Sequence, residues 1–442
     1  MTALSIALRL VRRRLTLVGL LAASLCAPAW AQTGGANRKL ARTYKEDRPR
    51  DVPIAEQTNA RTMLRTGVVT DKDLIDAVYR WRCAQLTWTS KLNETADLRL
   101  RLKADLRAAE RAAKPDAFDR LTPLVLKSMV AIVNDQEYHP TVRLNAMLLL
   151  GDLDARVVSG GAARFVPHPE ALPHLLSVAE DSAESVTGAG DAIRCAALHG
   201  LLRHGRSAAP DSAERQAISK AAIAMASNAT APEGRNEAVH EWIRRRAVTV
   251  LEASVRPGAS DLDEQASDLL HVLIANRDEP LKLRLEAAQA FGRTQKEHAR
   301  DALAATQLAQ SLGALTIDLL NSEVVQVGRT GSTVRSAGSR ELLTHGLSKI
   351  SAALRTVEAS PVNSKAASAG NGAPNPEDPS AVQYLRSRLI TMRKSLGDVQ
   401  ANDAVTARNS TLLANDLNAW LDREAVVQTT PGIPDAVDEE PK

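Results

Sequence analysis

Cys195, His199 and His204 are the residues whose types and spacing come closest to a metal site. A cysteine and a histidine four residues apart share one face of a helix, and such pairs bind zinc in proteins. Cys195, however, falls on the apolar face of its helix, and no acidic residue is placed beside the three. We therefore expect structural or surface histidines here, with no metal and no cofactor.

A second histidine-bearing stretch, HEWIR from His240, begins like the zinc-binding helix of metalloproteases. That motif needs another histidine four residues after the first, and Arg244 stands there. The chain also lacks a G-x-S-x-G nucleophile elbow, a phosphate-binding loop and a dinucleotide-binding glycine motif. Aromatic residues are only 3% of the chain, which favours Trp81 and Trp88 as core anchors over a stacking platform for a ligand. We expect no catalytic residue and no enzyme activity.

The first 31 residues predict the compartment. Four arginines precede a short apolar run that ends in Ala29-Trp30-Ala31, a small-x-small cleavage signature before Gln32. The run is too short for a good membrane-spanning helix. Leu25 stands where a lipoprotein signal needs a small residue before its cysteine, which argues against anchoring through Cys26. We expect a signal peptide cleaved between Ala31 and Gln32, and a mature chain that is periplasmic or extracellular.

Removing that signal changes the charge balance. The full chain has 56 basic and 52 acidic residues, and the signal holds four arginines (Arg9, Arg12, Arg13 and Arg14) and no acid. The mature chain is therefore close to neutral. A uniformly basic surface for nucleic acid is not expected.

The cysteines of the mature chain are Cys83 and Cys195. Small exported domains that depend on disulfides carry many more. Each of the two lies in an apolar helical pattern, so buried thiols are expected, with one long-range disulfide as the alternative.

Ala, Leu, Val and Ile dominate the apolar 44% of the chain, which favours helices throughout. Four segments align without gaps, each with an arginine followed three residues later by an alanine. They are VRLNAMLLLG from Val142, IRCAALHGLL from Ile193, IRRRAVTVLE from Ile243 and LRLEAAQAFG from Leu283. Each follows another amphipathic stretch, so a repeating unit of two helices is predicted. The shared positions are Arg143, Arg194, Arg244 and Arg284, and Ala146, Ala197, Ala247 and Ala287.

The pattern V-R-x-x-A-x-x-x-L-G at the end of a two-helix unit resembles the HEAT repeat of armadillo-like α-solenoids. The first and fourth copies match it best, whereas Leu202 and Glu252 replace the final glycine in the second and third. The resemblance implies an all-α, right-handed α-solenoid of about four to five helical pairs, with extra helices at both ends. It is specific for architecture and says little about function.

The four arginines lie at helix starts, where a cation gains nothing from the dipole of its own helix. The resemblance implies that they join a ladder of contacts between successive repeats, often with an acid about six residues earlier. Glu137 and Asp278 stand at that position for two copies, and Gly188 and Ala238 stand there for the others. We therefore expect a partial ladder.

The other segments differ in composition. Residues 32–60 are polar without a period and predict a flexible leader. Residues 61–117 predict N-terminal helices, one of them capped by Asp71, and residues 118–357 hold the solenoid. Residues 358–380 predict a Ser/Ala/Pro/Gly linker, 381–425 a helical hairpin that could cap the stack, and 426–442 a disordered acidic tail.

A signal followed by a repeat array predicts an exported scaffold that binds protein partners on a long helical face. Two alternatives stay open. One is a structural protein of the cell wall or envelope, and the other is a loop-based metal- or cofactor-dependent enzyme, such as the lyases that HEAT-like domains accompany in some proteins. No nucleic-acid partner is expected, and no stable membrane span after signal cleavage. The sequence specifies neither the partner nor the oligomeric state.

Overall fold

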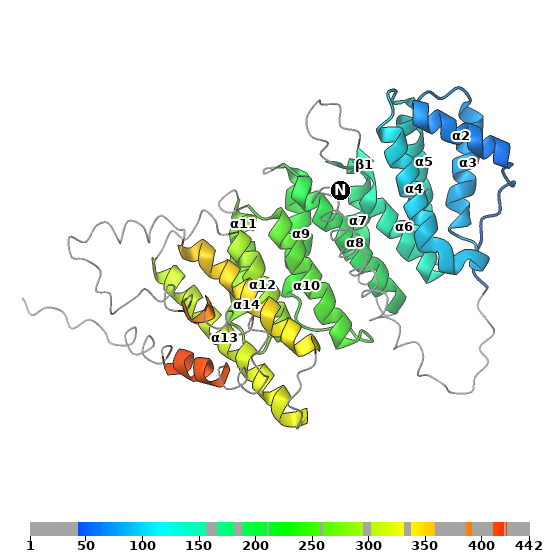
Figure 1. Cartoon of the computed structure of the whole chain (residues 1–442). Helices are drawn as coiled ribbons and strands as arrows, with labels where there is room; N and C mark the ends of the chain where they lie inside the picture. Colours follow the sequence, from blue (N-terminus) through cyan, green and yellow to red (C-terminus); the bar gives the residue numbers. More distant parts are fainter. Residues whose placement is uncertain are drawn as a thin grey trace, which may run out of the picture. The chain divides into compact units, whose positions relative to one another are not determined.

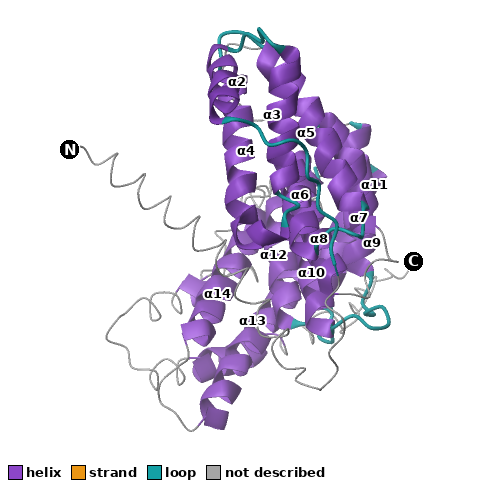
Figure 2. Ribbon diagram, turned by 90° about the vertical axis from the view of Figure 1, so that its right-hand side faces the viewer, coloured by secondary structure: helices purple, strands orange, loops and turns teal. Residues whose placement is uncertain are grey.

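The computed structural model describes residues 43–155, 166–180, 188–209, 212–256, 260–294, 302–330, 337–358, 385, 387–390, 410–419 and 421. The secondary structure of these ranges is helical except for one pair of two-residue strands, so the expected all-α class is confirmed (Figure 2). Strand β1 (Asp154–Ala155) pairs antiparallel with β2 (Val166–Pro167), which the sequence did not predict. All described helices and strands belong to one unit, Lys45–Lys442.

The helices of this unit follow one another in pairs along the chain (Figure 1). In chain order they are α2 (Ile54–Thr66), α3 (Lys72–Gln85), η2 (Thr89–Glu94), α4 (Thr95–Glu110), α5 (Asp116–Asn134), α6 (Pro140–Asp152), η3 (Pro169–Ala171), α7 (Leu172–Glu180), α8 (Gly188–Ser207), α9 (Ala213–Ser227), α10 (Glu237–Ser254), α11 (Asp261–Ala275), α12 (Leu281–Thr294), α13 (Ala302–Thr330) and α14 (Ala337–Glu358).

Contacts between these helices arrange them in two rows. In one row α4, α6, α8, α10, α12 and α14 each pack on the next, and we call this the B row. In the other, α3 packs on α5, and α7, α9, α11 and α13 pack in succession. Helices α3 and α4 thus extend the two rows by one position on the N-terminal side of α5 and α6. Helix α2 contacts both α3 and α4. The N-terminal helices are therefore a further pair within the same packing.

The alanines shared by the four sequence copies lie at the centre of this packing. Ala146, Ala197, Ala247 and Ala287 are fully buried, and so are the leucines that close three of the copies, Leu150, Leu201 and Leu251. A small side chain at the alanine position lets the second helix of a pair lie close to the first, while the leucines fill the layer between pairs.

Neighbouring helices of the B row meet backbone to backbone at small residues. A Cβ atom on Gly292 of α12 would lie 2.4 Å from the Cα of Ala353 in α14. A Cβ atom on Gly151 of α6 would lie 2.8 Å from the Cα of Gly200 in α8. The glycine that ends the repeat pattern in the first and fourth copies is therefore required by the approach of the next helix.

The expected leader over residues 32–60 ends earlier than predicted. Helix α2 begins at Ile54, and the extended segment Lys45–Pro53, which we call the strap, packs against later parts of the chain. Its polar sequence shows no apolar period because hydrogen bonds hold it in place, together with the single buried side chain of Val52. Asp71 caps α3 as predicted, accepting a hydrogen bond from the Leu74 N–H at 2.9 Å.

Several expected segments lie outside the described residues. They include the signal peptide with Ala31 and Gln32, residues 32–42 of the leader, all but the first residue of the 358–380 linker, and the tail at 426–442. Of the C-terminal hairpin, residues 385, 387–390, 410–419 and 421 are described and are helical. Leu385, Leu389 and Leu417 are fully buried there, and Arg388 pairs with Asp416 at 2.9 Å.

Among the described ranges, no helix is both long enough and apolar enough to cross a membrane.

Candidate functional site

The four repeat arginines are buried rather than exposed to solvent. In three of them Nε donates a hydrogen bond to a carbonyl in the last turn of the preceding helix. Arg143 reaches Val133 at 2.8 Å, Arg244 reaches Ala226 at 3.0 Å and Arg284 reaches Ile274 at 3.1 Å. The arginine thus stands at the negative end of the neighbouring helix dipole, where a cation is favoured.

The guanidinium groups then pair with acids of the following helical pair. Arg244 binds both carboxylate oxygens of Glu279, at 2.6 and 2.7 Å, and Arg284 binds Asp318 of α13 at 2.6 Å. The partner expected from the sequence for Arg284, Asp278, was wrong, because Arg284 pairs with Asp318. The expected pairing of Arg143 with Glu137 stays a prediction. Asp278 lies on the loop before α12, one residue before Glu279. Its backbone N–H donates a hydrogen bond of 3.0 Å to the side-chain oxygen of Asn276.

The second copy departs from this arrangement. Arg194 lies 4.0 Å from Asp191, one turn earlier on its own helix. Asp191 also accepts a 2.9 Å hydrogen bond from Arg235, which precedes α10 in the next pair. An arginine–carboxylate contact between successive pairs is therefore kept. Here the following pair supplies the arginine, Arg235, and the earlier pair supplies the carboxylate, Asp191.

Cys195, His199 and His204 do not form a metal site. Among the described residues, no group of three or more His, Cys, Asp or Glu side chains is placed to hold a metal ion. Cys195 and His204 are buried while His199 is exposed. Cys83 and Cys195 are both thiols and both buried in the described structure, which confirms the expectation of two buried thiols.

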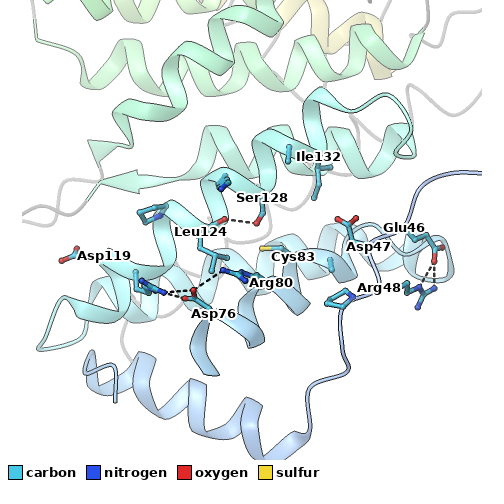
Figure 3. Close-up of a pocket in the computed structure, with 16 residues that line it drawn as sticks. Glu46, Asp47, Arg48, Asp76, Arg80, Cys83, Asp119, Leu124, Ser128 and Ile132 are labelled. Atoms are coloured by element: carbon cyan, nitrogen blue, oxygen red, sulfur yellow. Dashed lines mark hydrogen bonds and ion pairs between the residues drawn. The ribbon is translucent and has the colours of Figure 1, made fainter. Parts of the chain in front are cut away.

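A hollow lies between α3 and α5, and Figure 3 shows its lining. This α3–α5 groove has a volume of about 1100 Å³. Helical spacing places its lining on one face of each helix. The lining residues are Asp76, Arg80, Cys83 and Ala84 of α3, eight residues of α5 from Asp119 to Ile132, and residues 46–49 of the strap.

The floor of the groove is apolar and its rim is charged. Cys83 and Leu124 contribute to the floor, and Pro123 lies in the wall. Because proline has no N–H, it cannot donate to the Asp119 carbonyl four residues earlier, as a helix would require. The Asp119 carbonyl of α5 therefore lacks the N–H donor that a regular helix would supply.

The rim charges are largely paired with one another. Arg120 binds Asp76 through two hydrogen bonds of 2.8 Å, and Arg80 lies 3.5 Å from the same carboxylate (Figure 3). On the strap, Arg48 pairs with Glu46 at 2.5 Å. Hydrogen bonds from Thr89 and the charge of Arg48 lower the pKa of Glu46 to about 2. The rim thus combines both signs of charge.

The strap closes one end of the groove. The Trp88 indole N–H donates to the Asp47 carbonyl at 2.7 Å, and the Tyr138 hydroxyl donates to the Asp47 carboxylate at 2.9 Å. Arg48 stacks on the Trp88 ring at 4.5 Å. Trp81 and Trp88 meet edge to face, with centroids 6.4 Å apart, so Trp88 joins the core to the strap. Sequence reasoning missed these strap residues because nothing in their pattern marks them.

Cys83 is the one thiol in the lining of the groove. Burial raises the pKa of its thiol to about 12, although a hydrogen bond with Ser128 and the charge of Arg82 act in the opposite direction. The thiol is therefore protonated at neutral pH, and only a thiolate is a strong nucleophile. Cys83 acts here as an apolar surface.

Comparisons with protein-family models, with curated proteins and with solved structures gave no match. The site is therefore interpreted from its own geometry.

Proposed function

We propose that this protein is an exported, right-handed α-solenoid of HEAT-like helical pairs that acts as a scaffold for partner proteins. Four gapless copies of the arginine–alanine pattern and the two rows of packed helices support the architecture. The signal-like N-terminus supports export. Stacked helical pairs expose long faces that suit the binding of polypeptides.

The α3–α5 groove carries this proposal, and its occupant is an extended segment of a partner protein. The groove has an apolar floor for side chains, a rim of both charges, and the Asp119 carbonyl, which lacks its regular helical donor, as an acceptor for a partner N–H. The strap already lies at one end of it as extended chain. A binding role fits better than catalysis because the rim charges are paired and Cys83 remains protonated.

Photo-crosslinking inside cells tests this role. A photoreactive phenylalanine replaces Lys127, which lines the groove, and in a matched control it replaces Lys220, which is exposed on α9. We expect a discrete protein adduct from position 127 and none from position 220. Equal adducts from both positions, or none from position 127, would contradict the groove as a recognition site.

Filling the groove gives a second readout. Ala131 is exposed on the groove side of α5, so Ala131→Trp occupies the space without disturbing the core. Its control is Ala224→Trp, at an exposed alanine of α9. Loss of the adduct in the first variant but not in the second locates binding in the groove.

Export has its own test. N-terminal sequencing of the protein recovered from outside the cytoplasm should begin at Gln32, one residue after Ala31. Recovery of only the full-length chain in the cytoplasm would reject the signal peptide.

A further inference from the structure

Trp242 is an exposed tryptophan on α10, with 37% of its surface accessible. Arg245 and Arg246 follow it by three and four residues, so the three side chains share one face of the helix. Arg246 lies 5.1 Å from the centre of the Trp242 ring. Tryptophan and arginine are the residues most enriched at the energetic centres of protein interfaces.

A groove of about 440 Å³ lies beside this face, between α10, α12 and α14. Its charged and polar lining is Arg245 of α10, Lys282 and Glu286 of α12, and His345 and Lys349 of α14. Figure 1 shows these three helices next to one another in the B row. We call Trp242, Arg246 and this lining the Trp242 face.

Positive charge exceeds negative charge on the Trp242 face. Glu286 is its one carboxylate, and it accepts from Arg245 at 3.2 Å and from Lys349 at 2.6 Å. Arg246 and Lys282, both exposed, have no carboxylate partner among the described residues. Four permanent cations thus share a single acid, and they come from three different helices.

The cations of the Trp242 face are grouped, not spaced by the separation of the helix axes. Arg245 of α10 and Lys349 of α14 bind the same oxygen of Glu286, which lies on α12. Lys282 of α12 lines the same groove. An acidic segment that lies across this groove therefore meets cations of α10, α12 and α14 together.

We propose that the Trp242 face binds an extended acidic segment of a partner protein, with its carboxylates against the grouped cations and an apolar residue against Trp242. Aromatic rings on helical and sheet surfaces bind such extended segments because their backbone is already ordered. The Trp242 face lies on the B row, apart from the α3–α5 groove, so either site can fail without the other.

Fluorescence anisotropy with labelled synthetic peptides tests the charge requirement. One peptide, the spaced peptide, has glutamate at every third position with proline and alanine between, and the other has glutamine at the same positions. We expect the full chain to bind the spaced peptide at least about tenfold more tightly, a difference of about 1.4 kcal/mol. Added salt should weaken this binding because the charges are exposed. Equal affinity for both peptides would overturn the proposal.

Variants locate the binding on the face. Trp242→Ala, and separately Arg246→Gln with Lys282→Gln, should each weaken binding of the spaced peptide about tenfold. The charge variant should also leave the thermal unfolding temperature unchanged, because Arg246 and Lys282 are exposed. The control removes the same charge elsewhere, through Arg65→Gln on α2 and Lys220→Gln on α9. If the control variant binds the spaced peptide as weakly as the face variants do, the proposal is overturned.

Two further outcomes assign the face to something else. Polyphosphate that binds as tightly as the spaced peptide, and loses affinity in the same variants, would make this a general polyanion surface. The chain's own tail carries Asp435, Asp438, Glu439 and Glu440. Peptide binding that appears only after these four are changed to their amides would assign the face to the tail. Either result would reject a partner segment as the occupant.

Discussion

Arg215 of α9 and Asp263 of α11 form a fully buried, bidentate ion pair, with nitrogen–oxygen distances of 2.9 and 3.1 Å. The two side chains are 2% and 1% exposed. Arg215 also donates to the Ser254 carbonyl, and Asp263 accepts from the Arg256 N–H and the Ser260 hydroxyl. A single contact thus ties together two helical pairs, the end of α10 and the start of α11.

Removing one partner of this pair leaves a buried charge unpaired. We expect Arg215→Met to lower the free energy of unfolding by about 3–5 kcal/mol, and Arg215→Met with Asp263→Leu to recover most of that loss. Urea denaturation measures both. The comparison is Arg120→Met, which breaks the more exposed pair with Asp76 and should cost about 1 kcal/mol or less. A double variant as unstable as the single one would show that the hydrogen bonds, not the charge, dominate.

Arg244 is expected to be structural, not a surface charge. It donates to Ala226 through Nε and to Glu279 through its two terminal nitrogens, whereas all the donors of a lysine sit on one nitrogen that cannot reach both groups. Arg244→Lys should therefore lower the free energy of unfolding by about 2–4 kcal/mol. Arg246→Lys, two residues away and exposed, should change it by less than about 0.5 kcal/mol. Equal effects on the denaturation midpoint would reject the ladder role.

Gly292 is expected to tolerate no side chain. Gly292→Ala places a Cβ against the Ala353 backbone, so it should destabilise the fold by about 1–3 kcal/mol. Because the clash is with main-chain atoms, adding Ala353→Gly should restore little of that stability. Thermal unfolding of the single and double variants checks this, and full rescue by Ala353→Gly would contradict it.

Stability should fall as the pH is lowered below neutrality, in part through His204. Burial, together with the charges of Arg203 and His168, lowers the pKa of His204 from 6.5 to about 4. Between these two values the unfolded chain binds a proton that the folded chain does not, so the stability is complete above pH 6.5 and is lost as the pH falls. This residue alone contributes a loss of about 2 kcal/mol by pH 5.

Urea denaturation at pH 7.5 and pH 5 measures that loss. His204→Leu should reduce the difference between the two pH values, whereas His345→Leu, at an exposed histidine of α14, should leave it unchanged. The same pH dependence in all three proteins would exclude His204 as a source of it.

The strap should detach locally when its anchors are removed. Tyr138→Phe deletes the hydrogen bonds to the Asp47 carboxylate, and Trp88→Phe deletes the one to its carbonyl. Each lost hydrogen bond is worth about 1 kcal/mol, so hydrogen exchange over Lys45–Val52 should accelerate roughly fivefold in each variant. Trypsin should also cut faster after Arg50. Tyr79→Phe, in the core and away from the strap, is the control. If this variant also accelerates hydrogen exchange over Lys45–Val52, the effect reflects a general loss of stability and not detachment of the strap.

The sequence by itself determined the helical class, the repeated pairs, the buried alanines and thiols, and the positions of the four arginines. These follow from local patterns, because apolar spacing along one helix fixes which face is buried. The start of α2 was missed, since the strap is held by hydrogen bonds to residues 40 or more positions away and leaves no apolar period.

Only the tertiary structure decided which groups meet. Glu279 and Asp318, not the nearer Asp278, receive the arginines, because the reach of a guanidinium is set by the packing of successive pairs and not by sequence distance. The same holds for Arg215 with Asp263, and for the α3–α5 groove and the Trp242 face, whose residues come from different helices. A sequence pattern fixes the faces of single helices, while the distances between helices exist only once the rows are packed.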